Sequence, residues 1–467
     1  MKIKILLLCV AFFVLLLNAC SNSAKKQDLS TEITKQFGPI ERSFDVIRDS
    51  LDEENWLEVE KNEIVKICVD VPVVAWKTSL KSSILNDSCL IFQAPTLVGV
   101  DTVKVFFPEA DTSNNINLAV GMKYLNFKNE KVLLGFNEYS EERQKILGEK
   151  NTDPERLASV TGTYLVDKYP VTNCEFIQVL WDSIPEKATY DNKLFIEQDR
   201  QKWLLRRKNS KRNENCVTHD TATNVIPLFQ TFKYANARSA REGLKPYYIF
   251  SDTIMAENGE RAFYNNGSYG FIVYYWDFKQ QKNRYVKVSV DESSDGYRLP
   301  YYDEWMMFAR GGDKKNRAPW GDSTATLEEA QKYAQFNSVR PRSAEEESIL
   351  KPVGLLQPNG YGLYDMFGLV EERVLVTNVN IRGDFGFPSL LKGGGYWVEL
   401  TEEGFNVLFN PYWKWIDYGY FHPGHHGTTG GFRLIRNIGK KTVWNDPDKK
   451  IIYDDEPFYT PVDWGCD

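Results

Sequence analysis

The sequence has few of the residues from which metal and redox centres are usually built. Its 467 residues include four histidines and seven cysteines, which leaves little room for a multi-histidine metal centre or a disulfide-dense small scaffold. It has no excess of positive charge: the formal net charge is −7, so no nucleic-acid partner is expected. Its first apolar run, residues 5–17, is shorter than the roughly 20 residues that a membrane-spanning helix needs.

That apolar run follows Lys2 and Lys4, as in the leader of an exported protein. It ends in Leu-Asn-Ala-Cys at Cys20, which resembles the lipobox of bacterial lipoproteins. We therefore expect cleavage before Cys20, acylation of this cysteine, and anchoring to a membrane through its acyl chains. The alternatives are an ordinary signal peptide or an N-terminal anchor helix. Ser21 lacks the acidic retention signal, which favours the outer membrane, on its periplasmic face or at the cell surface.

The cysteines that would remain after acylation are Cys68, Cys89, Cys174, Cys216 and Cys466. An envelope compartment permits disulfides. Cys68 and Cys89 lie in neighbouring strand-like segments and are the expected pair. The number left is odd, so at least one thiol stays free or pairs between chains.

The amino-acid composition and the predicted secondary structure change along the chain. We expect a leader (1–19), a polar tether with a short amphipathic helix at 44–51 (20–60), a small β-sandwich of immunoglobulin-like type (61–119), a loop-rich domain (120–440) and a tail (441–467). Helices are predicted at 172–184, 228–242 and 302–310. Thr172 and Glu175 form a capping-box pattern, and glycines follow the other two helices.

Five groups of motifs run in order through the loop-rich domain. They are YLVDKYPVTN (164–173), YANARSAREGLKPYY (234–248), YRLPYYDEW with ARGG and PWG (297–321), PNGYGLYDMFG (358–368), and KGGGYW paired with GFR (392–397, 431–433). Together they resemble the formylglycine-generating enzyme, or sulfatase-modifying factor, family. The resemblance implies an irregular α+β fold related to C-type lectins, which agrees with the loop-rich pattern.

The resemblance also shows what this chain lacks. The family's oxidase activity uses two cysteines between the last two motifs, where their thiolates bind copper(I) and attack the substrate. Residues 398–430 contain no cysteine. We therefore expect neither copper nor formylglycine generation.

A structural calcium is implied by the resemblance. The family's ligands match Asp365 and Glu372 through their carboxylates, and Gly368 and Val370 through their carbonyls. Such hard oxygen ligands suit Ca²⁺. The alternative is that Asp365 caps a turn and Glu372 forms an ion pair.

Aromatic residues are dense at 405–421, where the family's cysteines would lie. Tyr412, Trp413, Trp415 and Tyr418, with His422, are candidates for a binding groove whose rings stack on sugar or peptide. The alternative is that these rings form a local core.

These features predict a non-catalytic, membrane-anchored binding or scaffold lipoprotein of the cell envelope, similar in organisation to those of gliding and secretion machines. Its partners would be envelope proteins or extracellular glycan. The alternatives are a glycan-binding surface module, and a divergent formylglycine-generating or other oxidoreductase enzyme.

Overall fold

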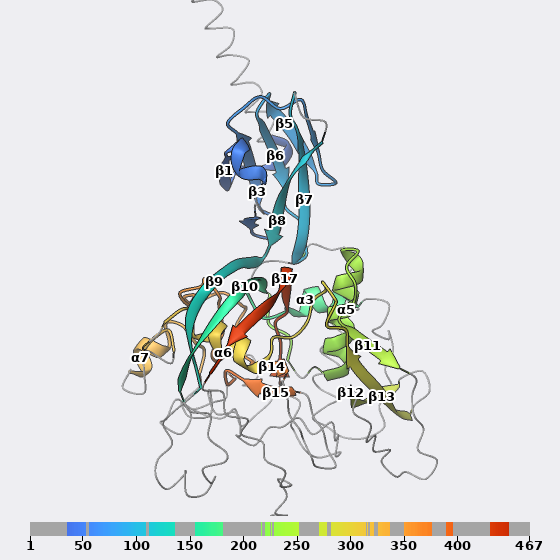
Figure 1. Cartoon of the computed structure of the whole chain (residues 1–467), viewed down its shortest axis with the longest axis vertical. Helices are drawn as coiled ribbons and strands as arrows, with labels where there is room; N and C mark the ends of the chain where they lie inside the picture. Colours follow the sequence, from blue (N-terminus) through green and yellow to red (C-terminus); the bar gives the residue numbers. More distant parts are fainter. Residues whose placement is uncertain are drawn as a thin grey trace, which may run out of the picture. The chain divides into compact units, whose positions relative to one another are not determined.

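The computed structural model divides the chain into two compact units, Met1–Val120 and Gly121–Asp467 (Figure 1). Each unit is described by itself. The residues that the structure describes are 35–52, 56–108, 112–135, 155–180, 216, 220–224, 226, 228–251, 270–277, 282–313, 315, 318–321, 326–336, 350–375, 389–395 and 430–447.

The first unit contains two four-stranded sheets, ordered β1-β3-β6-β5 and β2-β8-β7-β4. The strands are β1 (Arg42–Val46), β2 (Trp56–Val59), β3 (Ile64–Val69), β4 (Ala75–Lys77), β5 (Ser82–Asn86), β6 (Cys89–Gln93), β7 (Gly99–Phe106) and β8 (Asn114–Val120). Val65 and Phe92 from the first sheet share one buried cluster with Val103 and Ile116 from the second. The two sheets therefore pack face to face around a common core.

Cys68 on β3 faces Cys89 on β6, and the two are joined by a disulfide. This crosslink ties neighbouring strands in the middle of the first sheet.

The predicted tether is wrong from Arg42 onward. Strand β1 and strand β2 lie within residues 20–60, and the 3-10 helix η1 (Arg48–Asp52) stands between them, where an amphipathic helix was expected. Val46, Leu51 and Val59 are buried in the core of the first unit. Both strands pair in parallel, β1 with β3 and β2 with β8. Pairing partners this distant leave no mark on the local sequence pattern.

The described residues of the second unit form three three-stranded sheets, ordered β17-β10-β9, β11-β13-β12 and β15-β14-β16. Their strands are β9 (Met122–Leu134), β10 (Arg156–Asp167), β11 (Tyr248–Ser251), β12 (Gly270–Asp277), β13 (Lys282–Val290), β14 (Glu371–Leu375), β15 (Ser389–Lys392), β16 (Gly430–Gly431) and β17 (Ile435–Asn445). The helices are α3 (Asn173–Val179), α5 (Leu228–Arg241), α6 (Tyr302–Arg310) and α7 (Leu327–Ala330). The described part of the unit is thus a mixed α+β fold.

The predicted tail begins too early. Strand β17 continues through Asn445, and Val443, Trp444 and Asn445 pair with β10. Trp444 also packs against the core of the second unit. Residues 441–445 therefore belong to the domain.

The three predicted helices are present. Thr172 Oγ1 accepts a hydrogen bond from Glu175 N, and the Glu175 carboxylate accepts one from Thr172 N, so the capping box of α3 is confirmed. Helix α5 ends before Gly243, and α6 ends at Gly311 in the left-handed conformation. The predicted extension of α3 to Ile184 lies outside the described residues.

Helix α6 lies against the sheet that contains β9 and β10 (Figure 1). Trp305 and Phe308 are fully buried, and Phe308 makes an edge-to-face contact with Tyr164 of β10, with 5.4 Å between ring centroids. Trp305 makes a similar contact with Phe367 at 5.8 Å. Within the described parts of the chain, no helix has the length and apolar character needed to cross a membrane.

We expect Gly311→Ala to destabilise the second unit more than Gly243→Ala. Both glycines have a left-handed φ, 62° and 72°, and an L-residue in this conformation costs about 1–2 kcal/mol. A Cβ at Gly311 would also lie 2.7 Å from Gly360 N, whereas one at Gly243 would meet no atom within 4 Å. The free energy of unfolding of each variant in urea measures the difference, and equal losses would contradict the packing argument.

Candidate functional site

The motifs of the second unit meet at a buried ion pair between Arg433 and Glu372. Arg433 follows β16, and Glu372 lies on β14, directly opposite Gly431 in the parallel pairing of these two strands. Both side chains are completely buried. Arg433 Nε lies 2.9 and 2.8 Å from the two Glu372 oxygens, and Nη2 lies 2.6 Å from Oε1.

Glu372 accepts one further bond. Trp305 Nε1 on α6 donates to Glu372 Oε2 at 2.8 Å. A carboxylate has about four lone-pair sites, and three N–H groups, two of Arg433 and one of Trp305, donate to those of Glu372. Both oxygens of Glu372 therefore have partners, an arginine and an indole drawn from other motifs.

Arg433 also binds backbone. Its Nη1 donates to Asp167 O at 3.0 Å, and its Nη2 donates to Tyr364 O at 2.7 Å. The planar guanidinium can hold several acceptors at fixed angles. One side chain thus connects the end of β10, the loop before β14, and β14 itself.

A second buried pair joins Asp167 to Arg238 of α5. Arg238 Nη1 lies 2.8 and 2.9 Å from the two carboxylate oxygens, and Leu434 N donates to Asp167 Oδ2 at 3.0 Å. Burial works to lower the pKa of Arg238, but the Asp167 carboxylate together with Tyr297, Tyr234 and Glu242 outweighs this, so the pKa of Arg238 is raised. The Tyr297 ring lies 3.9 Å from Arg238 Cζ and covers its other side.

A third pair, Arg298 with Glu304, stands at the start of α6. Arg298 donates to both Glu304 oxygens at 2.7 and 2.8 Å. Tyr164 Oη donates to Glu304 Oε1 at 3.0 Å, and burial, followed by the charge of Glu304, raises the pKa of Tyr164 well above its ordinary value. Tyr164 is therefore neutral at any physiological pH and serves as a hydrogen-bond donor.

The residues of the expected calcium site lie on the turn that leads into β14. Asp365 has a left-handed φ of 53°, is buried, and accepts a hydrogen bond from Gly354 N at 2.6 Å. Gly368 N donates to Gly393 O at 2.9 Å, and Val370 packs in a small apolar cluster. Because Arg433 and Trp305 occupy the oxygens of Glu372, this donor set does not fit a calcium ion. The contacts match the alternative: Asp365 fastens a turn, and Glu372 forms an ion pair.

No group of three or more His, Cys, Asp or Glu side chains is arranged to hold a metal among the residues that the structure describes. The lipidation site Cys20 and the candidate groove residues Tyr412, Trp413, Trp415, Tyr418 and His422 lie outside those residues.

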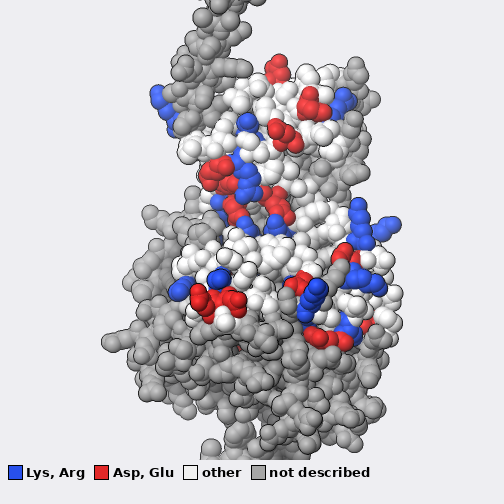
Figure 2. All heavy atoms as spheres, turned by 90° about the vertical axis from the view of Figure 1, so that its left-hand side faces the viewer, with Lys and Arg blue, Asp and Glu red and all other residues white. Residues whose placement is uncertain are grey.

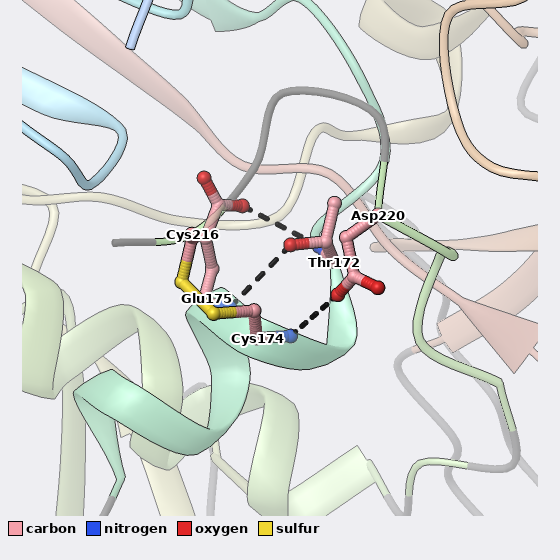
Figure 3. Close-up of a disulfide and its surroundings, with 5 residues drawn as sticks. All are labelled: Thr172, Cys174, Glu175, Cys216 and Asp220. Carbon is pink, nitrogen blue, oxygen red and sulfur yellow. Dashed lines mark hydrogen bonds between the residues drawn. A yellow bond between two sulfur atoms is a disulfide. The ribbon is translucent and has the colours of Figure 1, made fainter. Parts of the chain in front are cut away.

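One feature was missed from the sequence: a disulfide joins Cys174 to Cys216. Cys174 lies on the first turn of α3, beside the cap formed by Thr172 and Glu175, and Asp220 Oδ2 accepts a hydrogen bond from Cys174 N at 2.8 Å (Figure 3). The available signal was the presence of cysteines beyond Cys68 and Cys89 in a chain for which the sequence predicts export.

The surface carries no single-sign charge field over the described part of the face in Figure 2, where acidic and basic side chains lie side by side. Exposed pairs include Lys441 with Glu292 and Lys245 with Asp291. Lys245 and Ser293 lower the pKa of Asp291 to about 2.

The family is decided by a match over most of the chain. The sulfatase-modifying factor enzyme 1-like domain, FGE-sulfatase, matches residues 128–438. The chain belongs to this family. The match contains the three ion pairs described above, together with strands β10 and β14.

Two curated relatives match parts of this FGE-sulfatase chain. The chaperone protein LppX of Paenibacillus barcinonensis is 29% identical over 184 residues, 37% of this chain and 58% of that protein. The formylglycine-generating enzyme of Thermomonospora curvata is 30% identical over 117 residues, 22% of this chain and 39% of the enzyme. The chain thus spans less than two thirds of the length of either relative.

Solved structures are similar at lower identity. Treponema denticola variable protein 1 is 18% identical with a TM-score of 0.36, covering 73% of this chain and 99% of that one. CarF is 19% identical with a TM-score of 0.33, covering 68% and 98%. PvdO from Pseudomonas aeruginosa is 13% identical with a TM-score of 0.31, covering 71% and 97%.

We expect Glu372→Gln to destabilise the second unit by about 3–5 kcal/mol, because it leaves the Arg433 charge buried without a counter-charge. Glu292→Gln, which removes one partner of an exposed pair, is the matched control and should change little. Urea unfolding measures both. The opposite result would be a stability that depends on calcium, falls on chelation, and no longer responds to chelation in Glu372→Gln.

Proposed function

We propose that this chain is a membrane-anchored, non-catalytic binding or scaffold lipoprotein of the bacterial cell envelope, built on an FGE-sulfatase domain. The observation that carries the proposal is the lack of any cysteine in residues 398–430, within a domain whose scaffold is intact. Without thiolates this interval offers neither a soft copper(I) ligand nor a sulfur nucleophile.

The remaining charged groups of the motifs support the same proposal. Glu372, Asp167 and Glu304 are each buried and paired with an arginine. A carboxylate whose oxygens are bonded to a buried arginine has no oxygen directed at a substrate, so it is poorly placed to exchange protons with one. These acids act as supports of the loops and not as catalysts.

Export supports the envelope placement. The leader, the lipobox at Cys20 and two disulfides, Cys68–Cys89 and Cys174–Cys216, fit an oxidising compartment outside the cytoplasm. We propose the outer membrane as the site of anchoring. The first unit, which we propose to be immunoglobulin-like, would serve as the spacer that carries the domain away from the lipid.

The partner that we favour is a protein of the envelope. One of the matched relatives is a chaperone protein, so part of the chain resembles a protein that works on another polypeptide. The aromatic stretch at 405–421 would supply the rings of the binding surface.

Glycan binding is the second candidate function, because the same aromatic rings could stack on sugars.

We expect Cys20→Ala to release the protein from membranes, because acylation at this residue is the proposed anchor. Metabolic labelling with a fatty-acid analogue and fractionation of cells measure the effect. Cys9→Ala is the control, since Cys9 lies within the leader and should leave labelling unchanged. A Cys20→Ala protein that keeps its label would contradict the lipoprotein assignment.

Purified protein should not convert a sulfatase-type cysteine peptide to formylglycine in the presence of copper, and it should cross-link in cells to envelope proteins. Trp413→Ala with Trp415→Ala should weaken the cross-links, with Phe250→Ala as an exposed aromatic control outside the stretch. Formylglycine formation, read by peptide mass, would refute the non-catalytic assignment. Glycan-array binding that disappears in the Trp413→Ala, Trp415→Ala protein, without loss of cross-links, would establish the glycan candidate instead.

A further inference from the structure

A short segment, here called the strap and made of residues 220–224 with Ile226, runs beside the start of α3. Asn173 N donates to Thr221 O at 3.0 Å, and Thr223 N donates to Val171 O at 2.8 Å. Thr172 and Ala222 form an antiparallel bridge. The strap is therefore paired to the chain that enters α3.

The other side of the strap contacts β16. Ile226 N donates to Gly430 O at 3.4 Å, and a Cβ built on Gly431 would lie 2.5 Å from Thr223 O. Such an approach is possible only because the residue is glycine. The strap thus fixes the two residues of β16 from one side.

Strand β14 holds the end of the strap. Arg373, which is completely buried, donates from Nε and Nη2 to Ile226 O at 3.1 and 2.8 Å. In β14, Glu371 pairs with Gly430 and Glu372 pairs with Gly431. The strap and β14 therefore meet at β16, next to the Arg433–Glu372 ion pair.

Helix α3 contacts the same strand through its aromatic face. Phe176 stacks on Tyr234 of α5 at 5.5 Å with an angle of 7° between the rings, and both make edge contacts with Phe432 at 6.2 and 5.4 Å. Val171 N also donates to Phe432 O at 2.8 Å. Helix α3, the strap and residues 430–432 form one packed group.

The Cys174–Cys216 disulfide joins α3 of this group to a residue four positions before the strap begins. Cys216 is completely buried and Cys174 is partly exposed, and the bond joins residues separated by 42 positions. The hydrogen bond from Cys174 N to Asp220 repeats the same connection four residues after Cys216 (Figure 3).

We propose that the Cys174–Cys216 disulfide is a redox-sensitive clasp that holds the strap, and through it β16, in position. An external dithiol attacks Cys174 Sγ, because Cys174 is the less buried residue of the pair, and Cys216 leaves as a thiolate that takes up a proton. The second thiol of the reductant then displaces Cys174, so the protein gains two thiols and the reductant becomes a disulfide. With the clasp open, the strap keeps only its hydrogen bonds, and β16 loses part of its support.

The clasp matters for function because the aromatic stretch 405–421 precedes β16 in the chain, and in this respect the inference rests on the proposed binding role. Opening the clasp would loosen β16, which follows that stretch in the sequence. Exchange of the strap and β16 can be measured without any ligand, so the clasp and the binding role can fail separately.

The test uses the full chain and hydrogen–deuterium exchange read on peptides that cover the strap and residues 430–436. The starting protein is Cys68→Ser with Cys89→Ser, which leaves the clasp as the remaining disulfide among the described residues. We expect gentle reduction with dithiothreitol to raise exchange in both peptides by about tenfold or more, as for a local opening, and to leave α6 unchanged.

Cys174→Ser with Cys216→Ser in the otherwise natural chain should reproduce the increase without any reductant. If this variant does not fold, reduction of the folded protein and Asp220→Asn, which weakens the second connection, still decide the question. Exchange that is unchanged after reduction, with free thiols verified by alkylation, overturns the clasp. An increase spread over the whole second unit also overturns it, because the disulfide would then be a general staple.

Discussion

The Arg433 guanidinium is the group on which the loops of the second unit depend. Backbone carbonyls of this unit that lie outside the regular ladders need other donors. Arg433 supplies donors to Asp167 O and Tyr364 O while its charge is balanced by Glu372. A buried ion pair is weak evidence for stability, since desolvation opposes it. Its contribution here is geometric, because one planar guanidinium holds three separate segments in fixed positions. Trp305 donates to Glu372 Oε2, so both carboxylate oxygens have hydrogen-bond partners.

This dependence explains which parts of the domain could be predicted from sequence. Helices α3 and α6 follow from local signals, a capping box at Thr172 and a stop at Gly311, because both act within a few residues. Glu372 could not be interpreted in the same way. Its partner Arg433 is 61 residues away, and the pattern of oxygen-bearing residues around Glu372 suits calcium equally well until the arginine is placed. The sequence pattern did not predict strand β1 for a similar reason, since its parallel partner β3 lies beyond η1 and β2.

The two disulfides differ in the same way. Cys68 and Cys89 occupy facing positions on strands whose pattern is visible in the sequence, so their pairing could be predicted. Cys174 and Cys216 are brought together by the strap, and the strap exists because β16 and Arg373 hold its other end. A tertiary arrangement thus determines this bond, and no spacing rule would have found it.

The residues that shape this domain are separate from the interval in which the family carries its catalytic cysteines. The pairs that shape the domain, with Arg433, Arg238 and Arg298 as their cations, do not involve any residue of the interval 398–430. The described scaffold is therefore held by charged pairs that lie outside the interval in which the family carries its cysteines. In the sequence, the aromatic stretch at 405–421 precedes β16, and β16 is the strand held by both the ion pair and the strap.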